Sequence, residues 1–224
     1  MPLRFVDAST VVATVYEAHI GATGQVPTRP IAEGFVHDAL NALAWLRFPR
    51  LKARLNALQV RAIARDGLGE RRGPLRDAAT LFDENAIVLA VARHDPQARA
   101  VLEALRGHDW RGAFVAQRDA WERVVTPIAF GHALMQKLLR PFPSITAHAW
   151  VLDVSPRWFA TDMDARCRAV DAELTPLLEA LLSERAARTP LPVLGLPGWW
   201  AANAAPAFYD DVAVFRPRSG RASR

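Results

Sequence analysis

The sequence predicts a mainly helical protein with a few short strands, a pattern that leaves an α+β arrangement open. Three observations carry this prediction. Apolar residues recur every three or four positions over long stretches, prolines stand where those stretches begin or end, and only two apolar runs have strand length. Hydrophobic residues make up 51% of the 224 residues and charged residues 23%, the balance of a folded globular protein.

The order of elements follows from these periodicities. Helices are expected over residues 9–20, 32–48, 49–66, 75–82, 96–106, 114–125, 126–139 and 161–188. Strands are expected at 86–92 and 146–154, and Pro176 should kink the last helix. We expect one compact domain over residues 1–217, whose end is irregular and rich in proline and tryptophan, and a basic flexible tail at 218–224.

The helix expected at 49–66 has three distinct faces. At about 100° per residue, one face is apolar and belongs in the core: Leu51, Leu55, Leu58 and Ala62. A second face is basic: Arg50, Arg54, Arg61 and Arg65. A third is mixed: Lys52, Asn56, Gln59 and Ile63. The arginines and the Lys52/Asn56 pair should therefore point to different surroundings.

Positive charge is concentrated in the stretch 47–76. Nine cations stand there against two acids, a net charge of +7, while the whole chain carries only +5. Concentrated positive charge attracts phosphorylated ligands, nucleic acid or an acidic partner. The alternative is a solvated helix face without a ligand.

Several classes of protein are not expected. The one cysteine, Cys167, permits no internal disulfide and no cysteine zinc cluster. No run approaches the roughly 18 to 20 apolar residues of a membrane helix, and the start lacks the apolar core of a signal peptide. We therefore expect a cytoplasmic protein without a membrane partner; its oligomeric state is open.

Blocks of sequence along nearly the whole chain resemble one known family. They lie at 16–29, 37–56, 76–85, 130–137, 146–148, 191–203 and 208–217, and include Arg76-Asp77, Asp83-Glu84-Asn85 and Phe130-Gly131-His132. The chain resembles the domain-of-unknown-function family thirty twenty-five, found mostly in proteobacteria. The resemblance implies one domain over about residues 16–217 and brings no reaction with it.

Four residues are the candidate catalytic groups: His132, His148, Asp83 and Glu84. Both histidines have apolar neighbours in the sequence, and a histidine beside a carboxylate is the commonest acid–base pair. The adjacent His37 and Asp38 are the alternative pair. No HExxH or similar spacing occurs, so no metal ligands are assigned, although a metal site assembled from distant segments stays open. The alternative is that both are core histidines with satisfied hydrogen bonds.

Seven polar residues are the candidate ligand-binding groups: His37, Asn41, Lys52, Asn56, Arg72, Arg76 and Asn85. His37 and Asn41 share one helix face, and Lys52 and Asn56 repeat the same spacing beyond Pro49. If the two helices form a hairpin, these side chains line one cleft. Alternatively, the asparagines tie the hairpin together by hydrogen bonds.

The favoured hypothesis is an enzyme that acts on a small anionic or phosphorylated ligand by histidine–carboxylate acid–base chemistry or with a metal. The alternatives are a nucleic-acid-binding module that uses the stretch 47–76, or an interaction protein that uses its tryptophan-rich end. No cofactor is indicated by any motif.

Overall fold

The computed structural model describes residues 3–12, 15–30, 35–67, 73–184 and 188–218. The predicted class is confirmed, because the fold is mainly helical with short strands, a mixed α+β arrangement. The chain forms two compact units. Unit 1 comprises Met1–Ala86, Ala129–Leu139 and Asp162–Ala187, and unit 2 comprises Ile87–Ile128, Arg140–Thr161 and Arg188–Arg224.

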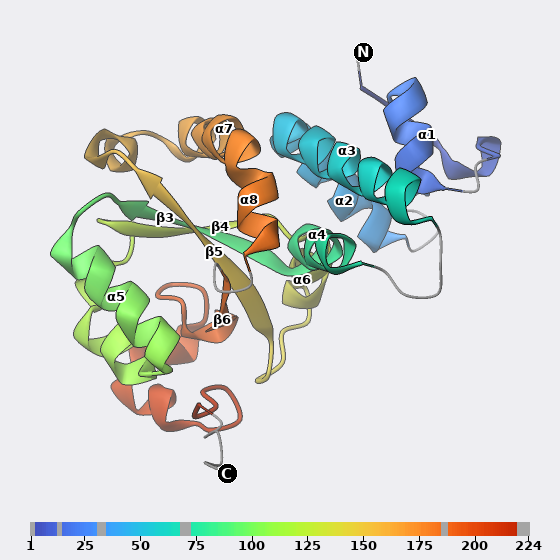
Figure 1. Ribbon diagram of the computed structural model, residues 1–224. Coiled ribbons are helices and arrows are strands. Elements are labelled where there is room, and N and C mark those ends of the chain that lie inside the picture. The colour runs from blue at the N-terminus through green and yellow to red at the C-terminus, as the bar shows by residue number, and fades with distance from the viewer. Residues whose placement is uncertain (1–2, 13–14, 31–34, 68–72, 185–187, 219–224) are drawn as a thin grey trace, which may run out of the picture. The chain divides into compact units, whose positions relative to one another are not determined.

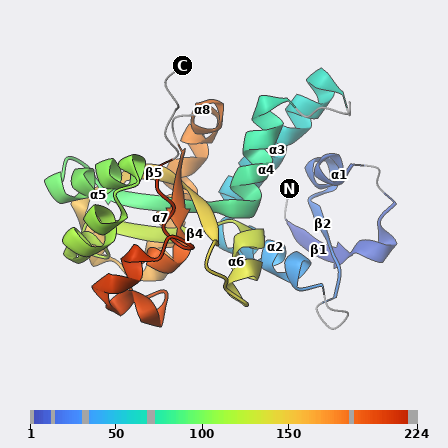
Figure 2. The same ribbon diagram turned by 90° about the horizontal axis from the view of Figure 1, so that it is seen from below.

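Unit 1 is a cluster of helices with one small sheet. Its helices are α1 (Tyr16–Thr23), α2 (Val36–Arg47), α3 (Pro49–Asp66), α4 (Pro74–Asn85), α6 (His132–Leu138), α7 (Met163–Leu174) and α8 (Leu178–Ser183). The strands β1 (Arg4–Asp7) and β2 (Gln25–Thr28) pair in parallel. Figure 1 shows α2 and α3 side by side, and Figure 2 shows β1 and β2 together.

The helix α3 forms as its sequence predicts. Pro49 occupies its first turn, where the missing N–H costs nothing, and the predicted core face of Leu51, Leu55, Leu58 and Ala62 is buried. No side chain within the helix caps its N-terminus. Asp171 of α7 does so, because its carboxylate accepts hydrogen bonds from the backbone N–H groups of Leu51 (2.8 Å) and Arg50 (3.3 Å).

Unit 2 is built on a four-stranded sheet in the order β4-β3-β5-β6. Its strands are β4 (Val125–Ala129), β3 (Ala86–Ala92), β5 (Thr146–Val154) and β6 (Arg188–Pro192), and its main helix is α5 (Pro96–Gly107). All seven residues of β3 are buried, as the short apolar run predicts for an inner strand. β5 and β6 are antiparallel, with Ala147 opposite Leu191.

An aromatic cluster holds the last segment of the chain in unit 2. The rings of Tyr209 and Phe215 pack on the fully buried Phe114, with ring centroids 5.6 and 6.1 Å away. Asn203 donates hydrogen bonds to the backbone oxygens of Leu194 and Leu196. The end of the chain is therefore a series of turns fixed by side chains, and residues 219–224 of the predicted tail lie outside the described residues.

Three predicted helices are wrong in part. In the 9–20 segment, the described residues form a turn at Ala8–Thr10, and α1 begins only at Tyr16. The 114–125 segment breaks into short turns, because Glu122 takes a left-handed backbone with φ 68°. Pro127 does not start a helix but lies in β4, at the edge of the sheet, where a proline costs no ladder hydrogen bond.

β6 was not expected, since its two prolines hide the strand pattern. It too is an edge strand, which explains why it tolerates them. The expected kink at Pro176 is present: α7 ends at Leu174 and a short turn leads into α8. Within the described residues, no helix has the length and apolarity needed to cross a membrane.

Candidate functional site

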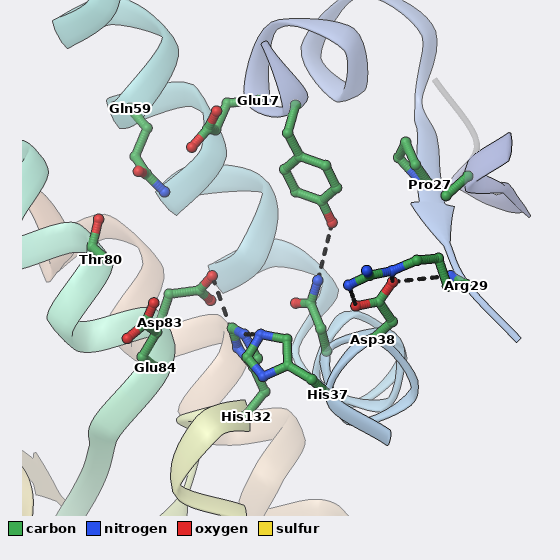
Figure 3. A pocket seen from close by; sticks show the side chains of 13 residues that line it. Glu17, Pro27, Arg29, His37, Asp38, Gln59, Thr80, Asp83, Glu84 and His132 are labelled. Carbon is green, nitrogen blue, oxygen red and sulfur yellow. Dashed lines mark hydrogen bonds and ion pairs between the residues drawn. The ribbon is translucent and has the colours of Figure 1, made fainter. Parts of the chain in front are cut away.

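Unit 1 contains a cavity of about 460 Å³ whose wall is mostly polar. It is lined by Ala8, Tyr16, Glu17, Pro27, Arg29, His37, Asp38, Asn41, Gln59, Thr80, Asp83, Glu84 and His132. These residues come from α1, α2, α3, α4, α6, β2 and the turn before α1, so the cavity exists only when the unit is folded. Figure 3 shows Asp83, His132 and His37 next to one another in its wall.

Lys52 lies in the protein behind this wall and is only 3% exposed. Its Nζ donates hydrogen bonds to Asp83 Oδ1 (2.5 Å) and to Asn41 Oδ1 (2.7 Å). Asn41 in turn donates from Nδ2 to the hydroxyl of Tyr16 at 3.0 Å. A buried ammonium needs such a set of acceptors, because an unpaired buried charge is strongly unfavourable. Lys52 therefore joins α2, α3 and α4 at one point and fixes Asp83.

Asp83 and Glu84 occupy an electrostatically unfavourable place. They lie in the last turn of α4, where the negative end of the helix dipole opposes a carboxylate by about 0.3–1 kcal/mol each. The partners there are lysines: Lys52 pairs with Asp83, and Lys137 donates to Asn85 Oδ1 at 2.8 Å. Glu84 has no ion-pair partner among the described residues, so one carboxylate at this helix end remains uncompensated.

The two histidines of the cavity face each other. The Nε2 atoms of His37 and His132 are 3.0 Å apart, and the rings meet edge to face with centroids 4.5 Å apart. The other nitrogen of His37, Nδ1, lies 3.0 Å from Gln136 Oε1. The Nδ1 of His132 lies 4.0 Å from Asp83 Oδ2 and has no hydrogen-bond partner. Two ring nitrogens in contact share a single proton, so the rings are coupled acid–base groups.

Gly131 sets His132 beside Asp83. It precedes α6, and its N–H donates to the oxygen of Ala86 at 2.9 Å. A Cβ at this position would overlap the backbone of Glu84 and Asn85, so only glycine allows the two helix ends to approach so closely.

The electrostatics of the site keep His132 neutral. Burial lowers the pKa of His132 from 6.5 to about 4, and this outweighs the attraction of Asp83, which acts in the opposite direction. The charge of Lys52 also lowers that pKa. Burial raises the pKa of Tyr16 to about 12, so its hydroxyl stays protonated. A neutral imidazole can accept a proton and a phenol can donate one.

A second ion pair closes the other side of the cavity. Arg29 donates to both oxygens of Asp38, from Nε at 2.8 Å and from Nη2 at 2.9 Å, and its guanidinium lies over the ring of Phe35. The Arg29 guanidinium holds the pKa of Asp38 below its usual range. The pair is therefore a neutral unit with one charge of each sign.

The structure brings together most of the predicted site. His37, Asn41, Asp83, Glu84 and His132 line the cavity, with Lys52 immediately behind it. Of the four side chains expected to line one cleft between α2 and α3, His37 and Asn41 line the cavity, whereas Lys52 and Asn56 do not. The hydrogen bond between Lys52 and Asn41 instead ties the two helices together, as the alternative interpretation of the asparagines predicts.

Other predicted residues lie elsewhere. Asn56 is buried and donates to the backbone oxygen of Glu17, tying α3 to α1, and Asn85 accepts from Lys137. Arg76 contacts the oxygen of Gly67. His148 lies half-buried on β5 in unit 2 near Trp150 and is not among the residues that line the cavity. Arg72 lies outside the described residues.

Sequence reasoning assigned no site role to Tyr16, Glu17 or Arg29, and it named Asp38 only as the carboxylate of an alternative acid–base pair with His37. All four stand inside sequence blocks that carry the family resemblance, and Tyr16 is one of only two tyrosines. That signal pointed to these residues without indicating that they share a cavity with α4 and α6. In the part of the chain that the structure describes, no group of three or more His, Cys, Asp or Glu side chains is arranged to hold a metal ion.

The basic stretch 47–76 is largely paired. Arg54 and Arg61 both contact Glu179 of α8, at 2.8 and 2.9 Å, and Arg47 contacts Asp164 at 2.7 Å. Five of its nine cations form ion pairs with carboxylates: Arg47, Lys52, Arg54, Arg61 and Arg65. Part of the local excess of arginine therefore serves to pair with acidic residues that are distant in the sequence, such as Asp164 and Glu179.

The comparison with known families gives one match. The model of a family described as protein of unknown function, DUF3025, covers residues 3–219, so the chain belongs to that family. No curated protein and no solved structure matches the chain.

Proposed function

We propose that this member of the DUF3025 family is an enzyme that performs acid–base chemistry on a small molecule in the cavity of unit 1. The observation that carries the proposal is the 3.0 Å contact between His37 Nε2 and His132 Nε2 beside Asp83. A cavity of about 460 Å³ is within the usual size range for a small-molecule site.

The groups have distinct roles in this proposal. His37 and His132 line the cavity and transfer the proton; since they share one proton, a proton taken up by one ring can pass to the other without movement of either ring. Asp83 favours the protonated form of His132. Lys52 is a positioning residue, because it holds Asp83 at 2.5 Å without lining the cavity itself.

Nucleic-acid binding by the stretch 47–76 stays a second prediction. We place nucleic-acid binding below the enzyme hypothesis because Arg54 and Arg61 are already paired with Glu179. A paired cation releases fewer counterions from a phosphate backbone and so contributes less to binding. The arginines have a structural role in ion pairs. The enzyme hypothesis instead relies on groups for which no structural role is evident, above all His132, whose Nδ1 has no hydrogen-bond partner.

The test is a metabolite extract incubated with purified protein and followed by mass spectrometry. We expect the wild type to consume at least one metabolite. His37→Gln should reduce that rate by about 100-fold or more, since general acid–base groups contribute at least that factor. His94→Gln, an exposed histidine on unit 2, is the matched control and should react as the wild type does. An extract left unchanged by the wild type, or changed equally by His37→Gln, contradicts the proposal.

A further inference from the structure

The two cations of the site are already neutralised by partners of their own. Arg29 is held by Asp38 through two contacts of 2.8 and 2.9 Å, and Lys52 by Asp83 at 2.5 Å. A cation in such a pair has little charge left for an anionic ligand, and the pairs would have to break to bind one. This differs from the anionic ligand expected from the sequence.

Two carboxylates of the cavity remain without such a partner. Neither Glu17 nor Glu84 forms an ion pair with any of the described residues. Figure 3 shows Glu17 with Gln59 on one side of the pocket and Glu84 with Asp83 on another. With both ion pairs counted as neutral, the wall carries a net negative charge from these two side chains.

A third group of the cavity wall, His132, has a buried polar atom without a hydrogen bond. His132 is only 5% exposed and lines the cavity, yet its Nδ1 has no hydrogen-bond partner. Buried polar atoms in native proteins are nearly always hydrogen-bonded, and those that are not need an explanation. Burial holds the pKa of His132 near 4, so the ring contributes no positive charge to offset Glu17 and Glu84.

We infer that the ligand of this cavity is a small organic cation, a molecule bearing ammonium or guanidinium groups that pair with the carboxylates of Glu17 and Glu84. The last turn of α4 favours the same charge, because the negative end of the helix dipole lies beside Glu84. The hydroxyl of Thr80 and the amide of Gln59 also line the cavity and supply neutral polar groups to the rest of such a molecule.

The cavity's preference for a cation does not depend on the proposed function; only the statement that this cation is a substrate rests on it. Binding is therefore tested separately from turnover. The probes are putrescine, a four-carbon dication, and succinate, a four-carbon dianion, titrated calorimetrically at equal ionic strength. We expect saturable binding of putrescine and none of succinate or inorganic phosphate. Glu17→Gln and Glu84→Gln should each weaken putrescine binding by about tenfold.

Glu173→Gln is the matched control, since it removes one exposed carboxylate of unit 1 that does not line the cavity, and it should bind putrescine as the wild type does. Circular dichroism and thermal melting confirm that each variant is folded. Absence of putrescine binding, tighter binding of succinate or phosphate, or unchanged binding in both cavity variants overturns the inference. Putrescine binding together with an unreactive metabolite extract would overturn the proposed function and leave this inference standing.

Discussion

At the scale of single residues, the chemistry of the site depends on the protonation state of His132. His132 is buried beside the carboxylate of Asp83, and this burial is the largest influence on its pKa. Had Asp83 been the stronger influence, the ring would be a cation bound to a fixed anion. Instead it is a neutral group in contact with His37, with a ring nitrogen free to accept a proton.

This state predicts a pH-dependent stability. The pKa of His132 is about 4 in the folded chain and near 6.5 when unfolded. Between these values the unfolded chain binds a proton that the folded chain does not, so the free energy of unfolding falls as the pH falls from about 6.5 to about 4. The contribution of His132 is on the order of 3 kcal/mol.

Urea unfolding near pH 7 and near pH 5 measures how much the free energy of unfolding depends on pH. We expect His132→Gln to lose clearly less stability than the wild type between the two conditions, because glutamine does not titrate. His94→Gln should keep the wild-type dependence, since that ring is exposed. A His132→Gln protein with the wild-type pH dependence would show that the proton is not taken up at this ring.

At the scale of elements, α3 is held from outside. Its first turn has no cap of its own, and Asp171 of α7, only 5% exposed, accepts two of its N–H groups. The same helix carries Lys52 one residue after Leu51, so the cap also fixes the residue that positions Asp83. The contact links segments 120 residues apart, which local sequence patterns do not reveal.

Asp171→Ala should therefore destabilise the chain by about 1–3 kcal/mol, because it leaves buried N–H groups without an acceptor. Urea unfolding at neutral pH gives this difference in free energy of unfolding. The control is Glu173→Ala, two residues further along α7 and exposed, which should change stability by less than about 0.5 kcal/mol. If both variants unfold alike, the cap contributes nothing to the fold.

At the scale of the whole molecule, the net charge of +5 is smaller than the local excess in the stretch 47–76, because acids elsewhere in the chain compensate it. We expect the salt dependence of any oligonucleotide binding to be the same in the wild type and in the Arg54→Ala, Arg61→Ala double variant, since both arginines contact Glu179. A fluorescence anisotropy titration over a range of salt concentrations measures the slope. A slope reduced by about two in the double variant would favour the nucleic-acid hypothesis.

Elements whose signals are local can be predicted from the amino-acid sequence. The helix α3 and the strands β3 and β5 have the predicted bounds, because a proline start, a helical period or a short apolar run defines each within its own residues. The candidate residues also came from local patterns: apolar neighbours and nearby carboxylates led to His132 and Asp83, and helical spacing on either side of Pro49 led to Asn41 and Lys52. Elements that depend on sheet edges, such as β4 and β6, were missed because prolines mask them.

Which of these groups meet depends on how the elements pack, and local sequence patterns do not show it. The tertiary structure brought Tyr16, Glu17, Arg29 and Asp38 into one cavity with α4 and α6, and it placed His148 outside the lining of that cavity. The charge of the site was decided in the same way, since a cation's effect depends on the carboxylate beside it, and the partners of Arg29 and Lys52 lie on other segments, 9 and 31 residues away. Sequence patterns report the period of an element, whereas the pairing of charges follows from the packing of elements against one another.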